Sequence, residues 1–366
     1  IFLLYILITK YKKIKINMLA GLVDKVEGQG VGSVYLELVD LLKDKKFNNF
    51  EILIDSNKKC DINHFHTIEL KNYFKMMDKS KNCNVMYVHF LPETLDGSIK
   101  LPWPAFDIFK QYVISFYKQA DYLIVVNPIF INSLVNIGIK REKIFYIPNY
   151  VSGDKFYKKE KDEIIKIKEK YNIPKDKFTV LGVGQVQTRK GVLDFVEVAK
   201  MLPDIEFVWA GGFSFGAITD GYKDLEKLVK NPPKNVKFLG IVPREEMNDV
   251  YNMADILFVP SYHELFPMAI LEAINLDKPL LVRDLELYKD ILFEKYYKAN
   301  FNDKFKELIL KLKDDKKFYK QGEENSKYLN EFYSKDHISD MWLEFYTMVY
   351  NNLKNKKEKK IKNDKK

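Results

Sequence analysis

Two glutamates, Glu264 and Glu272, stand eight positions apart and flank the start of a predicted helix. The apolar run 256–260 before them is typical of a buried parallel strand, and Pro267 suits the first turn of a helix. Helix N-termini bind anions through free backbone N–H groups and the positive end of the helix dipole. The amides that we expect to face a diphosphate are those of Leu265, Phe266 and Met268.

The two carboxylates suit the sugars on either side of that diphosphate. A carboxylate accepts hydrogen bonds from two neighbouring hydroxyls, which each sugar offers. Glu264 precedes the helix, near a donor sugar, whereas Glu272 lies about five residues into it, roughly 7.5 Å along the axis, within reach of a ribose. The spacing therefore favours a nucleotide-sugar site. The alternative is two solvated glutamates beside an ordinary helix.

A basic pair follows another strand-like run, 179–183. The loop begins with Gly184 and continues to Arg189 and Lys190, just before a helix that we expect from Val192. At that position Arg, as a bidentate fork, and Lys, as a point charge, are placed to neutralise a leaving diphosphate. A basic pair on the surface is the alternative.

Two further loops follow strand-like runs of the same series. The loop after 206–210 contains Gly212, and small residues allow a ligand to approach the backbone closely. The loop after 236–239 contains Val242, whose main-chain groups are expected to face a nucleobase. Each of these signals is weak alone, but their order along the chain is informative.

Apolar runs alternate with helical patterns in two series, which predicts two doubly wound parallel sheets of the α/β class. Ligands bind at the carboxyl ends of the strands in such sheets, so two domains would enclose a cleft. The strands expected in the first series are 14–19, 50–54, 85–88, 123–126 and 144–147. Those of the second are 179–183, 206–210, 236–239, 256–259 and 280–282.

Composition excludes several classes of protein. The 366 residues allow two domains, and 46% hydrophobic with 30% charged residues excludes wholesale disorder. The two cysteines, Cys60 and Cys83, cannot form a disulfide framework or a zinc cluster. A reducing cytoplasm fits best.

The net charge of +9 belongs to the ends of the chain. Residues 354–366 carry eight lysines against Glu358 and Asp364, and residues 1–16 carry four lysines and no acid, so the body is close to neutral. Such ends are attracted to anionic lipid or to nucleic acid, or are merely solvated. With no nucleic-acid recognition motif, we expect no nucleic-acid partner. The apolar stretch 1–8 is too short to span a bilayer, so membrane contact is expected to be peripheral.

The pattern as a whole resembles the retaining glycosyltransferases of the GT-B fold whose mark is the E-x7-E segment. In that family the first glutamate, here Glu264, contacts the donor sugar, the second, Glu272, contacts the ribose, and the Arg189 and Lys190 pair contacts the diphosphate. The family usually has an arginine directly after the loop glycine, where this chain has Gln185. We hypothesise that Arg189 supplies the missing cation.

The resemblance also implies roles in the first half. Gly30 and Gly32 resemble the loop after the first strand, which lies under the donor phosphates, and His89 resembles the active-site histidine near the donor hexose. The implied domains are an extension (1–14), an acceptor-binding domain (15–155), a nucleotide-sugar-binding domain (156–336), a crossover helix onto the first domain (337–353) and a disordered basic tail (354–366). Catalysis would retain the anomeric configuration without a protein nucleophile. No D-x-D pair occurs, so we expect no metal and no cofactor besides the UDP-hexose donor.

Four runs, 27–33, 90–94, 184–191 and 211–216, are similar to those of bacterial glycolipid synthases that act on diacylglycerol or monoglycosyl-diacylglycerol. We therefore expect UDP-glucose or UDP-galactose as donor, monoglycosyl-diacylglycerol as acceptor, and a peripheral location on the cytoplasmic face of an anionic membrane. The helix 104–118 is either interfacial or a core helix with its aromatic stripe inward. Alternatives are addition of the first sugar to diacylglycerol, synthesis of capsule, teichoic acid or another surface glycan, or a noncatalytic nucleotide-sugar-binding protein.

Overall fold

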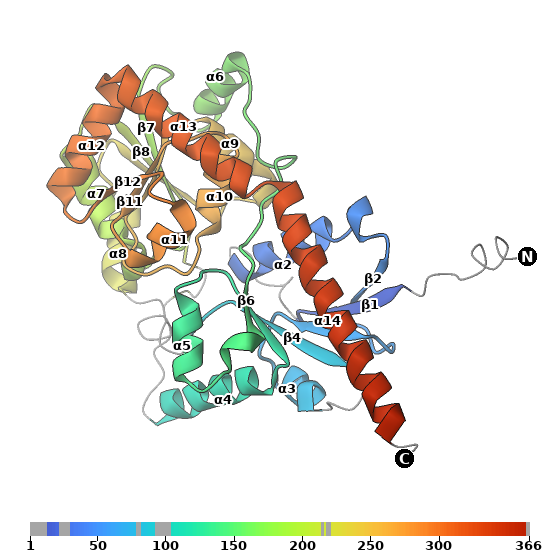
Figure 1. Ribbon diagram of the computed structural model, residues 1–366. Helices are drawn as coiled ribbons and strands as arrows, with labels where there is room; N and C mark the ends of the chain where they lie inside the picture. The colour runs from blue at the N-terminus through green and yellow to red at the C-terminus, as the bar shows by residue number, and fades with distance from the viewer. Residues whose placement is uncertain are drawn as a thin grey trace, which may run out of the picture.

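A computed structural model describes residues 13–21, 30–77, 82–91, 104–213, 216 and 221–363, and it contains two parallel sheets of six strands (Figure 1). The first sheet has the order β2-β1-β3-β4-β5-β6. Its strands are β1 (Ile14–Leu19), β2 (Phe50–Ile54), β3 (Ile62–Phe65), β4 (Cys83–Val88), β5 (Tyr122–Val125) and β6 (Ile144–Tyr146). Every residue of β4 is buried, as expected of a central strand covered on both faces.

The second sheet has the order β12-β11-β10-β7-β8-β9. Its strands are β7 (Thr179–Val183), β8 (Glu206–Ala210), β9 (Val236–Gly240), β10 (Ile256–Val259), β11 (Leu280–Arg283) and β12 (Tyr297–Ala299). All pairs of neighbouring strands in both sheets are parallel. The predicted α/β class with two Rossmann-like sheets is therefore confirmed.

Helices connect the strands and cover the sheets. Those of the first half are α2 (Gly30–Leu41), α3 (Leu70–Met77), α4 (Ala105–Gln119) and α5 (Phe130–Asn136). Those of the second are α6 (Lys161–Lys170), α7 (Val192–Lys200), α8 (Tyr222–Lys230), α9 (Met247–Asn252), α10 (Met268–Ile274), α11 (Lys289–Leu292), α12 (Asn302–Asp314) and α13 (Lys316–Phe332). The chain ends in α14 (Lys335–Asn363).

Two strands were not predicted, β3 and the short β12. The sequence of β3 contains Asn63 and His64, polar residues that do not suggest a buried strand. Each side chain has a partner inside the fold, since Asn63 donates to Asn84 Oδ1 over 3.1 Å and His64 Nδ1 lies 2.7 Å from the Tyr346 hydroxyl. The other ring nitrogen of His64, Nε2, is buried and has no hydrogen-bond partner among the described residues. Buried polar groups with such partners are tolerated in a core strand.

Helix α2 begins at Gly30. Gly30 and Gly32, which the resemblance placed in the loop after the first strand, therefore lie in the first turn of the helix. First-turn residues have no intrahelical N–H bond to lose, so glycine is tolerated there. Several segments singled out in the sequence, 1–12, 27–29, 92–94, 214–215 and 364–366, lie outside the described residues.

The aromatic helix α4 packs inward, so the core alternative for its stripe is confirmed. Val113, Phe116 and Tyr117 are buried, and Phe106 and Phe109 pack partly buried against the same core. Whether another face of this helix contacts a membrane stays a prediction. Exposed apolar side chains lie elsewhere on α3 and α4, as described below.

Helix α14 crosses back to the first sheet, as predicted (Figure 1). Trp342 and Tyr346 are buried there, and their ring centroids lie 5.4 Å and 5.9 Å from that of His64 on β3, in tilted and edge-on arrangements. The helix continues to Asn363, through residues predicted as a disordered tail, so that prediction is wrong for 354–363. No glycine or proline interrupts this segment, and lysine is a good helix former, so the packed part of the helix propagates into it.

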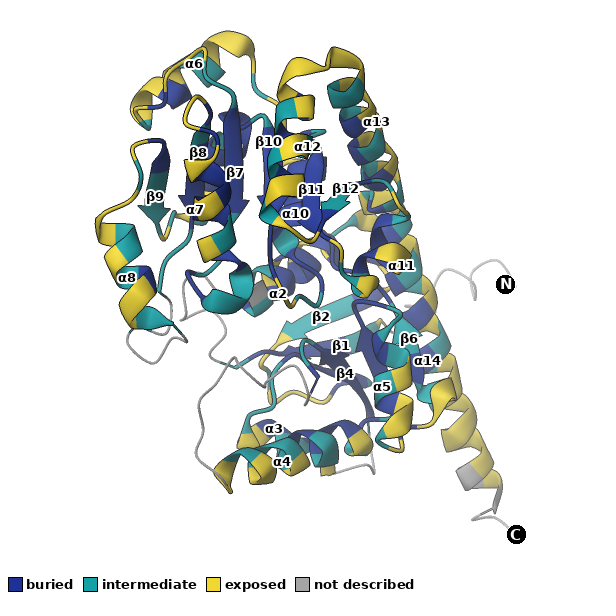
Figure 2. Ribbon diagram, turned by 90° about the vertical axis from the view of Figure 1, so that its left-hand side faces the viewer, coloured by how far each residue is buried: buried dark blue, intermediate teal, exposed yellow. Residues whose placement is uncertain are grey.

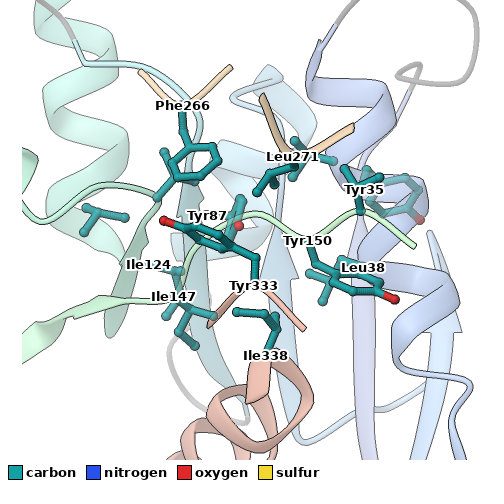
Figure 3. Packing of buried hydrophobic residues seen from close by; sticks show 14 of the residues in the cluster. Tyr35, Leu38, Tyr87, Ile124, Ile147, Tyr150, Phe266, Leu271, Tyr333 and Ile338 are labelled. Carbon is teal, nitrogen blue, oxygen red and sulfur yellow. The ribbon is translucent and has the colours of Figure 1, made fainter. Parts of the chain in front are cut away.

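The two halves meet at their helices and loops. Leu271 of α10 packs beside Tyr35 and Leu38 of α2, all within one hydrophobic cluster (Figure 3). Asn127, fully buried after β5, donates through Nδ2 to the Leu287 carbonyl over 2.9 Å and to the Leu265 carbonyl over 3.4 Å. The segments that follow strands of the first sheet are thus in contact with those of the second.

Candidate functional site

Four loops that the sequence singled out lie along one edge of the second sheet. They follow β7, β8, β9 and β10, which are neighbours in the order β10-β7-β8-β9. Because these strands are parallel, their carboxyl ends meet at the same edge. The predicted placement of Gly184, Gly212, Val242 and Glu264 after these ends is observed. Whether they bind a donor remains a prediction.

Two glycines bring these loops together. Gly211 has φ +134°, and a Cβ there would lie 2.0 Å from the Gly184 carbonyl oxygen. Gly191 has φ +70°, and a Cβ there would lie 2.3 Å from the Pro260 carbonyl oxygen. Only glycine fits these positive φ angles and close approaches without strain. The second contact holds the 3-10 turn η5 (Thr188–Lys190) against the loop that carries Glu264.

Lys190 and Glu264 form an ion pair at this point. Lys190 Nζ lies 2.5 Å from Glu264 Oε1, and both side chains are largely buried. Burial, partly opposed by Glu264, lowers the pKa of Lys190. A lysine has three N–H donors, so two remain for another anion beside Glu264. Lys190 and Glu264, which belong to separate loops of the chain, are therefore joined by an ion pair.

Arg189 is held by a chain of side chains. Gln187 donates to Gln185 Oε1 over 2.7 Å, and Arg189 Nε donates to Gln187 Oε1 over 2.9 Å. Arg189 Nη1 also donates to the His263 carbonyl over 3.4 Å. Gln185, which stands where the resemblance leads one to expect arginine, thus helps to orient Arg189. His263 itself is exposed.

The start of α10 differs slightly from the prediction. Pro267 is the N-cap, with φ −70° and ψ 122°, and the helix begins at Met268, one residue later than predicted. Phe266 is buried, with its ring 5.4 Å from that of Tyr333, and the Leu265 carbonyl accepts the contact from Asn127. The strand, loop and helix order is as predicted, and the anion-binding role of these amides remains a prediction.

Glu272 lies in the fifth position of α10, and it is buried rather than solvated. Its Oε1 accepts from Arg244 Nη1 over 2.6 Å, and its Oε2 accepts from the Tyr251 hydroxyl over 2.6 Å. Arg244 Nη2 also donates to Glu37 Oε1 on α2 over 3.0 Å. The two acidic groups raise the pKa of Arg244, although burial alone would lower it.

His89 follows β4 at the carboxyl edge of the first sheet. Its Nε2 lies 3.2 Å from Nδ1 of His66, and its ring lies against that of Tyr87. Burial lowers the pKa of His89 to about 3, so the ring is neutral near pH 7. Within the part of the chain that the structure describes, no hydrogen bond joins His89 to Lys190 or Glu264.

Sequence reasoning missed several residues around the site. They form its supporting contacts, and they are Glu37, His66, Asn127, Gln187, Arg244 and Tyr251. Of these residues, only Arg244 could have been found from the sequence, because it closely follows Val242 in a loop that was already assigned to the site. The described ranges contain no group of three or more His, Cys, Asp or Glu residues that could hold a metal ion. They also contain no helix long and apolar enough to cross a bilayer.

Residues 163–328 match the protein family described as "Glycosyl transferases group 1". Over 342 residues the chain is 43% identical to the alpha-galactosylglucosyldiacylglycerol synthase of Streptococcus pneumoniae, an alignment that covers 93% of this chain and 91% of that relative. Over 206 residues it is 28% identical to the processive diacylglycerol alpha-glucosyltransferase of Acholeplasma laidlawii, covering 56% of this chain and 61% of that protein.

Solved structures share the two-sheet architecture. The Anabaena protein HepE in complex with UDP-glucose superposes with a TM-score of 0.73 at 14% identity, covering 92% of this chain and 100% of that chain. A sucrose-phosphate synthase from Thermosynechococcus elongatus gives 0.73 at 14% identity, covering 93% and 100%. At these identities the likeness concerns the fold alone.

Proposed function

Because the chain belongs to the group 1 glycosyl transferases and has their GT-B fold, we propose that it transfers a hexose from a UDP-hexose to a monoglycosyl-diacylglycerol, with retention at the anomeric carbon. The product is then an α-linked diglycosyl-diacylglycerol. The name of the S. pneumoniae relative favours galactose as the hexose and glucosyl-diacylglycerol as the acceptor.

One observation carries this proposal. The 43% identity to a glycolipid synthase extends over 93% of the chain, so it includes the first sheet and its loops as well as the second. We assign donor binding to the second half and acceptor binding to the first, with domain limits near residues 15–155 and 156–336. A match confined to residues 163–328 would support a nucleotide-sugar site but say little about the acceptor.

The proposed chemistry uses the charged side chains at the carboxyl edge of the second sheet. Lys190 and Arg189 stabilise the negative charge that develops on the leaving diphosphate, and Glu264 orients the donor hexose beside them. Electrostatic stabilisation of developing charge is usually the largest catalytic contribution. The leaving diphosphate then accepts the proton of the acceptor hydroxyl, which attacks from the same face of the sugar. Glu272 holds the ribose, and neutral His89 contacts the hexose from the first half.

A peripheral membrane location follows from the proposed lipid acceptor. It is supported by the exposed apolar and basic side chains at one end of the molecule. Leu70, Phe74 and Met77 lie on one face of α3 and are 56–66% exposed, and Ile108 of the neighbouring α4 is 67% exposed. Figure 2 shows α3 and α4 at the end of the molecule away from the second sheet, where α14 also ends. Exposed lysines of α14 add positive charge there. Exposed apolar groups flanked by lysines suit an anionic bilayer surface.

The test is a transfer assay with defined lipids. Purified protein is incubated with labelled UDP-galactose or UDP-glucose and anionic mixed micelles that contain α-glucosyl-diacylglycerol or diacylglycerol, and the lipids are separated. We expect label in a diglycosyl-diacylglycerol, with Glu264→Gln as the inactive control. Label only in a monoglycosyl product would contradict the second-sugar assignment. Bound UDP-hexose with neither lipid labelled would contradict the lipid acceptor.

A further inference from the structure

A single arginine, Arg244, joins a carboxylate of the second half to a carboxylate of the first. Its Nη1 donates to Glu272 of α10 over 2.6 Å and its Nη2 donates to Glu37 of α2 over 3.0 Å. The two glutamate side chains are almost fully buried, with 5% and 1% exposed. The planar fork of an arginine can hold two carboxylates in fixed directions, which a lysine cannot do.

The surroundings fix this arginine from several sides. The guanidinium lies 5.1 Å from the centroid of the Phe156 ring, in the segment that links the two halves. Glu37 is itself held, because Oε2 accepts the Ser152 backbone N–H over 3.1 Å. Lys155 Nζ also lies 3.3 Å from Oε1, but the lysine side chain is 41% exposed, so solvent screens this pair and it contributes little. Figure 3 shows apolar packing between the same two helices, where Leu271 of α10 lies beside Tyr35 of α2.

Glu272 is oriented before any ligand arrives. Its two oxygens accept from Arg244 and Tyr251. Each carboxylate oxygen can accept a second hydrogen bond, so these contacts leave acceptor capacity on both oxygens for the hydroxyls of a ribose. The direction in which Glu272 presents its remaining lone pairs is set by Arg244, and Arg244 is set in turn by Glu37.

We propose that Arg244 is a positioning residue for donor binding, and that through Glu37 it makes the affinity for UDP depend on contact between the two halves. This inference rests on the proposed function. If the halves separate, Arg244 loses Glu37 and its hold on Glu272 loosens. By linkage, binding of UDP to a correctly oriented Glu272 must favour the joined arrangement to the same degree.

The chain offers a matched pair of variants to test this. Glu37→Gln removes the charge that Arg244 contacts on α2, although Glu37 belongs to the opposite half from the donor site. Lys155→Gln removes another partner of the same Glu37 at the same interface, but Lys155 makes no contact with Glu272 in the described residues. We would measure UDP affinity by calorimetry, and kcat and KM for UDP-hexose, on the full chain, with thermal melting as the control for folding.

We expect Glu37→Gln to weaken UDP binding and raise the donor KM about 5- to 20-fold, within the usual range of coupling between sites, with a smaller change in kcat. Lys155→Gln is expected to stay within about twofold of the unaltered protein. The double variant Glu37→Gln with Arg244→Gln should bind UDP no more weakly than Arg244→Gln alone, because both remove one connection.

Three results would overturn the inference. The first is a Glu37→Gln variant that binds UDP as tightly as the unaltered protein. The second is a Lys155→Gln variant whose UDP binding is weakened as much as that of Glu37→Gln, which would indicate general loosening of the interface. The third is a double variant whose loss of UDP affinity is the sum of the losses in the two single variants. If Arg244→Gln does not fold, the UDP affinities of Glu37→Gln and Lys155→Gln still test the inference. Absence of UDP binding by the unaltered protein would contradict the proposed function itself, and this inference with it.

Discussion

Lys190 Nζ lies 2.5 Å from Glu264 Oε1, and this ion pair joins the loop after β7 to the loop after β10. The two residues are 74 positions apart in the chain. Their charges compensate each other in a largely buried place, so neither can be removed alone without leaving an uncompensated charge. Single and double variants of this pair can therefore distinguish its effect on stability from its effect on hexose transfer.

Lys190→Met should destabilise the protein by about 3–5 kcal/mol and abolish hexose transfer, because Glu264 is left buried without its cation. The double variant Lys190→Met with Glu264→Gln should recover much of the stability but none of the transfer. Urea unfolding and the glycolipid assay measure the two properties. Full transfer by Lys190→Met would rule out its role at the diphosphate.

Arg189→Ala should weaken UDP binding about 10- to 100-fold, in keeping with the loss of a hydrogen bond to a charged group. Placing an arginine at the position that the family usually fills, Gln185→Arg, should restore affinity in the Arg189→Ala background. Calorimetry with UDP decides. If Arg189→Ala binds UDP as tightly as the unaltered protein, Arg189 does not substitute for the missing family arginine.

Stability should fall in acid because of three buried or half-buried histidines. Burial lowers the pKa of His64 and of His89 to about 3, and burial with the two neighbouring histidines lowers that of His66 well below its usual value. Unfolded histidine titrates near pH 6.5, so from about pH 6.5 down to about 3 the unfolded chain binds protons that the folded protein does not. Their stabilising contribution is thus complete above about pH 6.5 and is lost as the pH falls.

The variant His64→Gln should take up about one proton fewer on unfolding near pH 5, which lowers the slope of unfolding free energy against pH by about 1.4 kcal/mol per unit. Urea unfolding at pH 7, 6 and 5 gives this slope. An identical slope in the variant would mean that His64 is already protonated in the folded protein. Over pH 5–8 neutral His89 should add no ionisation to the activity profile.

Attachment to anionic vesicles should depend on both α14 and α3. Deletion of residues 354–366 should weaken binding in low salt and remove most of its salt dependence, because each near-surface lysine contributes about 1 kcal/mol. Replacing Leu70, Phe74 and Met77 by serine should weaken binding at every salt concentration. Co-sedimentation with vesicles distinguishes the two effects, and unchanged binding in either variant would contradict the corresponding contact.

Transfer should persist in EDTA. The chain has no D-x-D pair, and the proposed diphosphate charge is met by Lys190 and Arg189. The measurement compares rates with EDTA and with added Mg²⁺, and loss of turnover in EDTA that Mg²⁺ restores would contradict metal independence.

Local patterns were sufficient to predict most strands and the place of the donor loops. Continuous apolar runs such as 256–259 are buried on both faces, and the alternation of strands and helices dictates which ends share an edge. The Glu264 loop could therefore be assigned to a sheet edge from sequence. The same reasoning missed β3, because the partners of Asn63 and His64 lie on β4 and α14.

Sequence by itself thus determined the two-sheet fold, the order of the loops and the residue types at the donor edge, since these follow from periodicity and turn chemistry over short stretches. Tertiary structure alone decided which charges meet. Glu37 and Arg244 are 207 positions apart, and His66 and His89 directly follow the neighbouring strands β3 and β4. Such pairs depend on how whole sheets and helices pack, and no local periodicity encodes that packing.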